Sequence, residues 1–112
     1  MITHQQIEKR LDYLSKEIDD AQTSLVKAET SFHNVTAQYE VSMAKSRIKN
    51  SEAKMTVTTR EDLALLENEE LHFSLAVVEA EVKACRSNVI RVRTQVDIAR
   101  SISSSIKSSL EL

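Results

Sequence analysis

The side chains that most often carry catalysis or bind metal ions are scarce in this sequence and widely spaced. The three histidines, His4, His33 and His72, lie far apart along the chain, whereas the ligands of one metal ion usually follow short, defined spacings. We interpret all three as solvated residues on helix surfaces. The histidines therefore predict neither a metal site nor acid–base catalysis.

The single thiol and a local group of acids offer no catalytic arrangement either. No His or Lys is placed to activate Cys85, which we interpret as a buried structural thiol at an apolar helix position. Glu67, Glu69 and Glu70 spread around a helix rather than converge. The chain has no glycine, which phosphate-binding loops require. The sequence therefore predicts a protein that is not an enzyme and uses no cofactor and no small-molecule substrate.

The composition favours long helices and few turns. The 112 residues include no Gly, no Pro and no Trp, and only two Tyr and two Phe, so few can make tight turns or fill a wide core. The formal net charge of -2 reflects 15 Lys and Arg against 17 Asp and Glu. Because no charge excess directs the molecule to nucleic acid or an anionic membrane, such binding must come from a local patch.

Cysteine usage and the N-terminal residues bear on where the protein resides. One cysteine provides no disulfide framework, which fits a reducing compartment. Met1 to Lys9 lack the apolar core of a signal peptide, and nowhere do about eighteen apolar residues run together. We therefore expect a cytoplasmic protein with no membrane partner.

Apolar residues recur at alternating spacings of four and three in two long stretches. This heptad pattern is typical of helices that pack in a coiled coil. The first seam is Ile7, Leu11, Leu14, Ile18, Ala21, Leu25, Ala28, Phe32, Val35 and Tyr39, and the second is Leu71, Leu75, Val78, Val82, Cys85, Val89, Val92, Val96, Ala99, Ser103, Ile106 and Leu110.

The two seams fit an antiparallel pair of helices. Residue numbers of paired positions sum to 113 or 114, as for Ile7 with Ile106, and the midpoint falls in the β-branched cluster 55–59. The sequence therefore predicts an all-α fold, a long antiparallel two-helix coiled-coil hairpin in a single domain, 1–112. Helix one is expected at about 3–54, the turn at about 55–59 and helix two at about 60–110.

Two capping boxes mark the predicted helix starts. Thr3 with Gln6, and Thr58 with Glu61, each combine a hydroxyl with a side chain three residues later that can bond back to the cap. We therefore expect helix one to start just after Thr3 and helix two near Arg60.

Helix two has further apolar residues on the side away from its seam. Apolar residues on two sides of a helix usually mean that both sides are covered. We therefore predict self-association, as a four-helix bundle or a larger helical oligomer. Two alternatives are that this face docks another protein as a helix in a groove, or that its first residues merely cover the turn. The interface residues are Leu66, Phe73, Val77, Ala80, Ala84, Ile98 and Ile102.

Cations gather at the predicted tip of the hairpin. Oligomerisation would stack several tips into a basic surface that neutralises nucleic-acid phosphates without reading sequence. No aromatic residues accompany these cations for base stacking, which weakens the signal for nucleic-acid binding. The alternative is a solvated tip. The candidate nucleic-acid-binding residues are Lys45, Arg47, Lys49, Lys54 and Arg60, with Arg91 as a weaker candidate.

A basic row follows the second seam at a spacing of seven residues. The antiparallel register predicts that most of this row is paired within the hairpin, which sets register more than stability. The row is Arg86, Arg93, Arg100 and Lys107, opposite Glu29, Gln22, Ser15 and Glu8, with Asp12 and Asp19 one turn away.

Three segments, RVRTQVDIARS at 91–101, IEKRLD at 7–12 and VTTRE at 57–61, resemble small helical-hairpin proteins of tailed bacteriophages and prophages. Some of those proteins lie near replication and recombination genes. The resemblance covers most of the chain and implies an accessory role in phage DNA metabolism in a bacterial host, such as loading a recombinase on single-stranded DNA. The implied partners are the protein itself, single-stranded DNA, or a recombination or replication protein. Docking of a host or phage protein, and a structural role in the virion, are the alternative functions.

Overall fold

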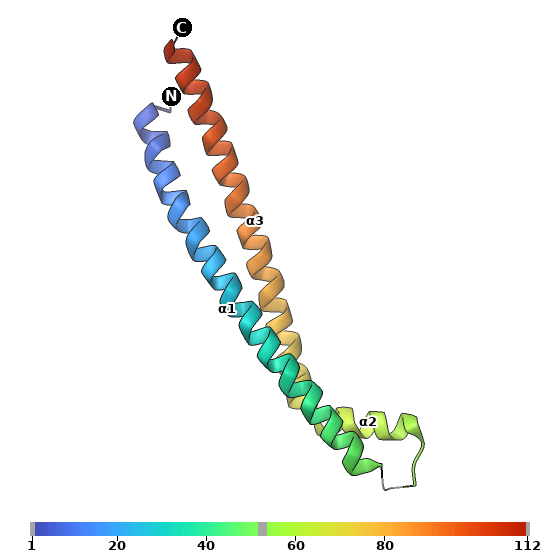
Figure 1. Cartoon of the computed structure of the whole chain (residues 1–112). Helices are drawn as coiled ribbons and strands as arrows, with labels where there is room; N and C mark the ends of the chain where they lie inside the picture. The colour runs from blue at the N-terminus through green and yellow to red at the C-terminus, as the bar shows by residue number, and fades with distance from the viewer. Residues whose placement is uncertain (1, 52–53, 112) are drawn as a thin grey trace. The chain divides into compact units, whose positions relative to one another are not determined.

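The computed structural model describes residues 2–51 and 54–111, and within these ranges the only regular elements are helices (Figure 1). α1 spans His4–Asn50, α2 spans Val57–Glu67 and α3 spans Glu69–Glu111. No strand occurs in the two ranges. The all-α class predicted from composition and periodicity is therefore confirmed.

The start of α1 has the capping box that the sequence predicts. The backbone N–H of Thr3 donates to Oε1 of Gln6 at 2.8 Å, and the backbone N–H of Gln6 donates to Oγ1 of Thr3 at 3.2 Å. Each residue thus satisfies a backbone donor of the other, and two N–H groups at the helix start have partners.

The start of α2 differs from the prediction. Thr56, not Thr58, is the N-cap, with φ −68° and ψ 158°, and its hydroxyl accepts from the backbone N–H of Thr59 at 3.2 Å. The β-branched residues therefore occupy the first helical turn, where no preceding turn crowds them. As a result the helix begins at Val57, three residues before the predicted start.

α1 ends at Asn50, within the range predicted for helix one. The backbone N–H and the hydroxyl of Ser51 both donate to the carbonyl of Ile48, at 3.2 and 2.6 Å. These bonds close the last turn and satisfy a carbonyl that would otherwise lack a partner. Positions 52 and 53 of the predicted helix lie outside the described residues.

The predicted second helix is two helices, which separate at Asn68. This residue has φ −114° and ψ 25°, outside the helical region, while its backbone N–H still donates to the carbonyls of Ala64 and Leu65, both at 3.2 Å. Its carbonyl accepts from the backbone N–H of His72 at 2.9 Å, at the start of α3. Figure 1 shows α2 leaving the line of α3 at this point. Asparagine is a weak helix former, and here it ends one helix and begins the next.

The chain divides into two compact units, and unit 1 combines Met1–Val26 with Lys83–Leu112. Its core consists of two apolar clusters shared by α1 and α3. The clusters pair early residues of α1 with late residues of α3, so the two segments run antiparallel. One cluster is Ile7, Leu14 and Ala99, packed by Leu11, Val96, Ile102 and Ile106, and the other is Ala21, Val89 and Val92, packed by Ile18 and Leu25.

Unit 2, Lys27–Val82, has a more polar interior. Met43 and Ala64 are buried there together with Ser46, Asn50 and Asn68. Beyond Tyr39 the alternating spacing would continue at Ser42, but the buried residue of α1 is Met43, because the seam steps by four twice in succession from residue 35 to residue 43. Such a step shifts the inward face of a helix around its axis. The interior of this unit therefore depends on hydrogen bonds as well as apolar burial.

Candidate interaction surfaces

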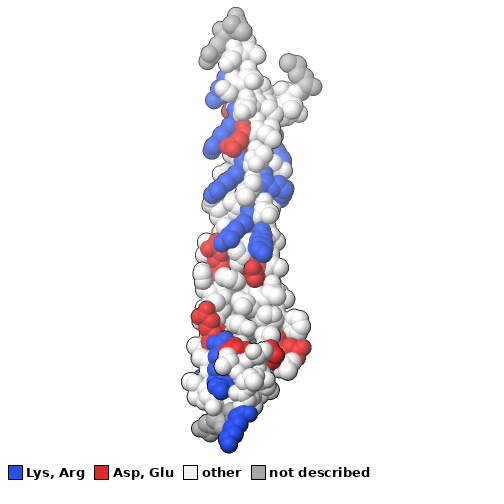
Figure 2. Space-filling view, turned by 90° about the vertical axis from the view of Figure 1, so that its right-hand side faces the viewer, with Lys and Arg blue, Asp and Glu red and all other residues white. Residues whose placement is uncertain are grey.

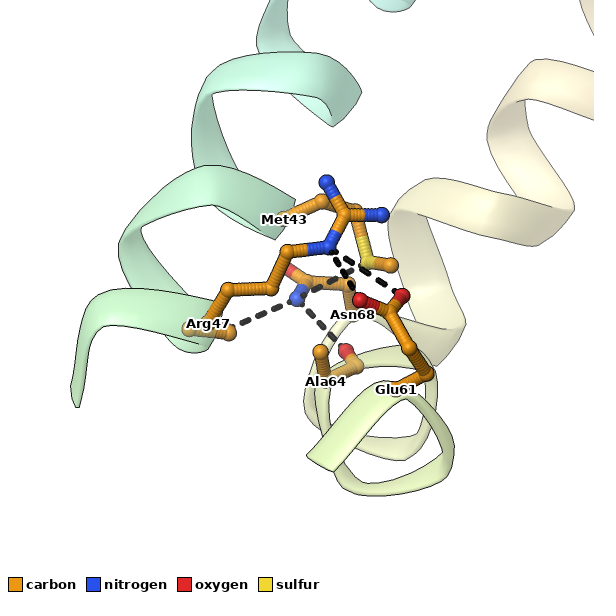
Figure 3. Close-up of polar contacts among 6 residues, drawn as sticks. Met43, Arg47, Glu61, Ala64 and Asn68 are labelled. Carbon is orange, nitrogen blue, oxygen red and sulfur yellow. Dashed lines mark hydrogen bonds and ion pairs between the residues drawn. The ribbon is translucent and has the colours of Figure 1, made fainter. Parts of the chain in front are cut away.

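A buried amide connects α1 with the junction of α2 and α3. Asn68 is 5% exposed, and its Nδ2 donates to the carbonyl of Ala64 at 2.7 Å and to Oγ of Ser46 at 3.0 Å. The same nitrogen lies 3.6 Å from Sδ of Met43 (Figure 3). The hydroxyl of Ser42 donates to Oδ1 of Asn68. The Ala64 carbonyl can only accept, which fixes the orientation of the amide. Both ends of the amide thus have partners.

A carboxylate on α2 is held at the end of α1. Nδ2 of Asn50 lies 3.3 Å from Oε1 of Glu67, and Nζ of Lys49 lies 3.6 Å from the same oxygen. Hydrogen bonds from Ser46 and Asn50, together with the charge of Lys49, hold the pKa of the Glu67 carboxyl below its ordinary value. Glu67 therefore serves as an ionised anchor for α2.

Three of the five cations predicted to bind nucleic acid at the tip have partners within unit 2. Nε of Arg47 lies 2.9 and 3.1 Å from the two carboxylate oxygens of Glu61, and Figure 3 shows the two groups facing each other. Nη2 of the half-buried Arg60 donates to the carbonyl of Met55 at 3.2 Å. The third is Lys49, which pairs with Glu67 as described above. The folded-back α2 thus supplies acids to the basic tip.

The remaining predicted cations lie in different places. Lys45 and Lys54 are exposed in unit 2, and neither has an ion pair within 2–51 and 54–111. Arg91 belongs to unit 1, where its Nη2 donates to Oδ1 of Asn88 at 2.7 Å. The available charge of the unit 2 tip therefore rests on two lysines.

The predicted second apolar face lies open in unit 2. Leu66, Phe73 and Val77 are 68%, 61% and 57% exposed, and Ala80 is exposed as well. Phe73, Val77 and Ala80 follow one another at spacings of four and three along α3, which places them on one side of the helix. The seam residue Leu75, on another side, is half-buried. Within the chain itself, α3 of unit 2 thus has a covered seam and an uncovered apolar face.

The other predicted interface residues belong to unit 1 and have different surroundings. Ala84 and Ile98 are exposed, whereas Ile102 is half-buried against the first apolar cluster. Ile98 and Ile102 line a groove of about 520 Å³ together with Ile7 of α1 and Ile2, which precedes that helix. The four isoleucines that line this groove therefore form a separate apolar site near the start of α1.

The predicted pairing of the basic row in unit 1 is not observed. Among the described residues its members form no ion pair, and Glu8, expected to pair with Lys107, lies 2.8 Å from Nε2 of His4 instead. The register predicts only the uncharged Gln22 and Ser15 opposite Arg93 and Arg100, and these residues offer no carboxylate. The row is Arg86, Arg93, Arg100 and Lys107, all of them exposed.

Two exposed isoleucines did not emerge from sequence reasoning. Ile48 is 72% exposed on α1, because the inward side of the helix at this point carries Met43 and Ser46. Ile90 is 63% exposed on α3, between Arg86 and Arg93. Its spacing of four and three from these arginines would have marked an apolar position within the basic row.

The residues considered for chemistry remain apart. Cys85 is a half-buried free thiol, and among the described residues no group of three His, Cys, Asp or Glu side chains is arranged to hold a metal ion. His33 and His72 make ring contacts with Phe32 and Tyr39, with centroids 5.7 and 5.8 Å apart. The search of this part of the chain also found no helix apolar enough over a sufficient length to cross a membrane.

Comparison of the chain with protein-family models, with curated proteins and with solved structures gave no match. The function is therefore argued from the surfaces described above.

Replacing Asn68 tests the buried amide. We expect Asn68→Ala to lower the free energy of unfolding by about 1–3 kcal/mol, because Ser42 and Ser46 lose their partner in a buried site. Urea unfolding followed by circular dichroism would measure the change.

The control is Asn34→Ala, at an exposed position of α1, where the same exchange changes helix propensity but breaks no buried network. Equal unfolding midpoints for the two variants would contradict a stabilising role for the Asn68 amide.

Proposed function

We propose that the protein is a non-enzymatic helical accessory protein that works by self-association. The observation that carries this proposal is the exposure of Leu66, Phe73 and Val77. Full burial of a large apolar side chain contributes roughly 1.5–3 kcal/mol, so three such residues supply a substantial driving force for association. A second copy covers this face, which gives a four-helix bundle or a larger helical oligomer.

We also propose that the coiled-coil register continues through both units, so that α1 and α3 form one antiparallel hairpin. Both units support it independently. Ala21 and Val92, which share a cluster in unit 1, have numbers that sum to 113, and the hydrogen-bonded Ser46 and Asn68 in unit 2 sum to 114. The proposed register pairs position 28 with position 85, whose numbers also sum to 113.

A second candidate function is DNA binding through the tip. It is favoured by the exposure of Lys45 and Lys54 and by their lack of ion pairs among the described residues. Repeated around an oligomer, these lysines form a basic surface that binds phosphates without reading sequence. Such binding fits an accessory role in phage DNA metabolism, in the cytoplasm of a bacterial host.

The common register predicts a new disulfide. We expect the thiol of Ala28→Cys to form an intramolecular bond with Cys85 on mild oxidation, because the shared layer brings the two small side chains together. Thiol titration and gel mobility without reductant at high dilution would detect it. Ala44→Cys, at an exposed position of α1, is the control and keeps its thiol free within the chain. Free thiols in oxidised Ala28→Cys would contradict the register.

Charge on the apolar face of α3 tests self-association. We expect the wild type to have an oligomeric mass by light scattering, and Phe73→Glu with Val77→Glu to weaken association by about tenfold or more, because carboxylates replace buried apolar groups. The control pair Ser74→Glu and Ala76→Glu adds the same charge to the same stretch of helix, off this face.

A wild type with the mass of a single chain would refute self-association. The apolar face would then be open for a protein of another kind, as in docking of a helix in a groove. An oligomer whose mass survives the Phe73 and Val77 substitutions would show that other residues hold it together.

Removing the two tip lysines tests DNA binding. Each lost phosphate contact changes the slope of log affinity against log salt by about 0.7 for single strands, so Lys45→Ala with Lys54→Ala should make the slope less steep by about 1.4. Titration of a labelled single-stranded oligonucleotide at several salt concentrations would measure it. Lys9→Ala with Lys16→Ala, in unit 1, is the control, and equal slopes for the two variants would count against the tip.

A further inference from the structure

One side of α3 in unit 1 carries a row of cations that have no acidic partner among the described residues. Arg86, Arg93, Arg100 and Lys107 lie about 10.5 Å apart along α3, as seven residues of a helix dictate. They are exposed and form no ion pair within 2–51 and 54–111. In Figure 2, Lys and Arg side chains follow one another along the upper part of the surface, with acidic side chains among them.

An acidic row with the same spacing lies on α1 of the same unit. Asp12 and Asp19 are seven residues apart and exposed, and neither has an ion pair among the described residues. They lie one helical turn after Glu8 and Ser15, the positions that stand opposite the basic row across the seam. Both rows therefore belong to the same side of unit 1, with the acids farther from the seam.

The antiparallel register sets the two rows at matching heights. The paired seam positions Leu14 and Ala99 share a cluster. Asp12 precedes Leu14 by two residues and Arg100 follows Ala99 by one, so in an antiparallel pair both charges are displaced toward the same end. Asp19 lies seven residues after Asp12 on α1, and Arg93 lies seven residues before Arg100 on the antiparallel α3. These two residues are therefore also level with each other. Each of these two levels thus carries one acid on α1 and one base on α3, and the exposed Asp97, seven residues after Ile90, lies between Arg93 and Arg100 on the same side of α3.

We propose that a second copy of this chain docks on this side of unit 1, so that Arg93 and Arg100 of each copy pair with Asp19 and Asp12 of the other. A two-fold axis parallel to the helices exchanges α1 and α3 across the interface while keeping the levels aligned. The same rotation therefore sets each basic row against an acidic row. This inference rests on the proposed self-association and adds a second contact face, in unit 1, to the apolar face of α3 in unit 2.

Apolar residues occupy the same side next to the charges. Val26 follows Asp19 by seven residues on α1 and is 65% exposed, and Ile90 is 63% exposed beside Arg93 on α3. Exposed ion pairs alone contribute little, so the burial of these two side chains supplies the driving force. The charges fix the register and orientation of the two copies.

A second copy fits this face better than nucleic acid does. Phosphates along the basic row would lie next to Asp12 and Asp19, whose carboxylates repel them. The α1 segment of another copy instead offers carboxylates at the seven-residue spacing of the arginines. The complementary surface is therefore already present in the chain.

A charge exchange tests the proposal. We expect Asp12→Lys with Asp19→Lys, and separately Arg93→Glu with Arg100→Glu, to weaken self-association by about tenfold or more in sedimentation or light scattering, because like charges then meet across the interface. The variant with all four substitutions restores association, since both rows reverse together. An equimolar mixture of the two double variants forms a mixed oligomer.

Helix content by circular dichroism shows that each variant is folded. A wild type that is a single chain would refute the proposed function itself. An oligomeric wild type whose mass is unchanged in both double variants would refute this interface alone. Loss of binding to a single-stranded oligonucleotide in Arg93→Glu with Arg100→Glu, with unchanged mass, would assign the row to nucleic acid and overturn the inference.

Discussion

The interior of unit 2 depends on one buried amide. An amide removed from water must find partners for both its donor and its acceptor, and Asn68 finds them in Ser42, Ser46 and the carbonyl of Ala64. Because Asn68 also ends α2 and begins α3, the same residue sets the break in the helix and ties that break to α1. The position of α2 follows from this constraint.

The return of α2 toward α1 changes the electrostatics of the tip. It brings Glu61 to Arg47 and Glu67 to Lys49, so acids from α2 neutralise cations that would otherwise face solvent. The contact between α2 and α1 also lowers the pKa of Glu67, because donors from α1 stabilise the ionised form of its carboxyl group. A surface that is basic in sequence is therefore only partly basic in the fold.

Unit 1 shows the opposite behaviour. Its interior is apolar, and its arginines and aspartates remain separate on one outer side, because the residues directly across the seam from Arg93 and Arg100 are uncharged. The chain thus presents an exposed apolar face on α3 in unit 2 and rows of exposed cations and acids in unit 1. Two different faces that each bind another copy would build assemblies larger than a dimer.

Heptad periodicity and composition by themselves determined the helical class, the inward residues of both seams in unit 1 except Leu110, which is 73% exposed, and the Thr3 cap, since these follow from local spacing and backbone chemistry. They also identified Phe73 and Val77 as apolar residues off the seam. Only the tertiary structure decided the break at Asn68, the cap at Thr56 and which cations have partners. Those features depend on contacts between residues distant in sequence, such as Ser46 with Asn68 and Arg47 with Glu61. A periodic pattern records which side of a helix faces inward, and it has no information on which polar groups meet there.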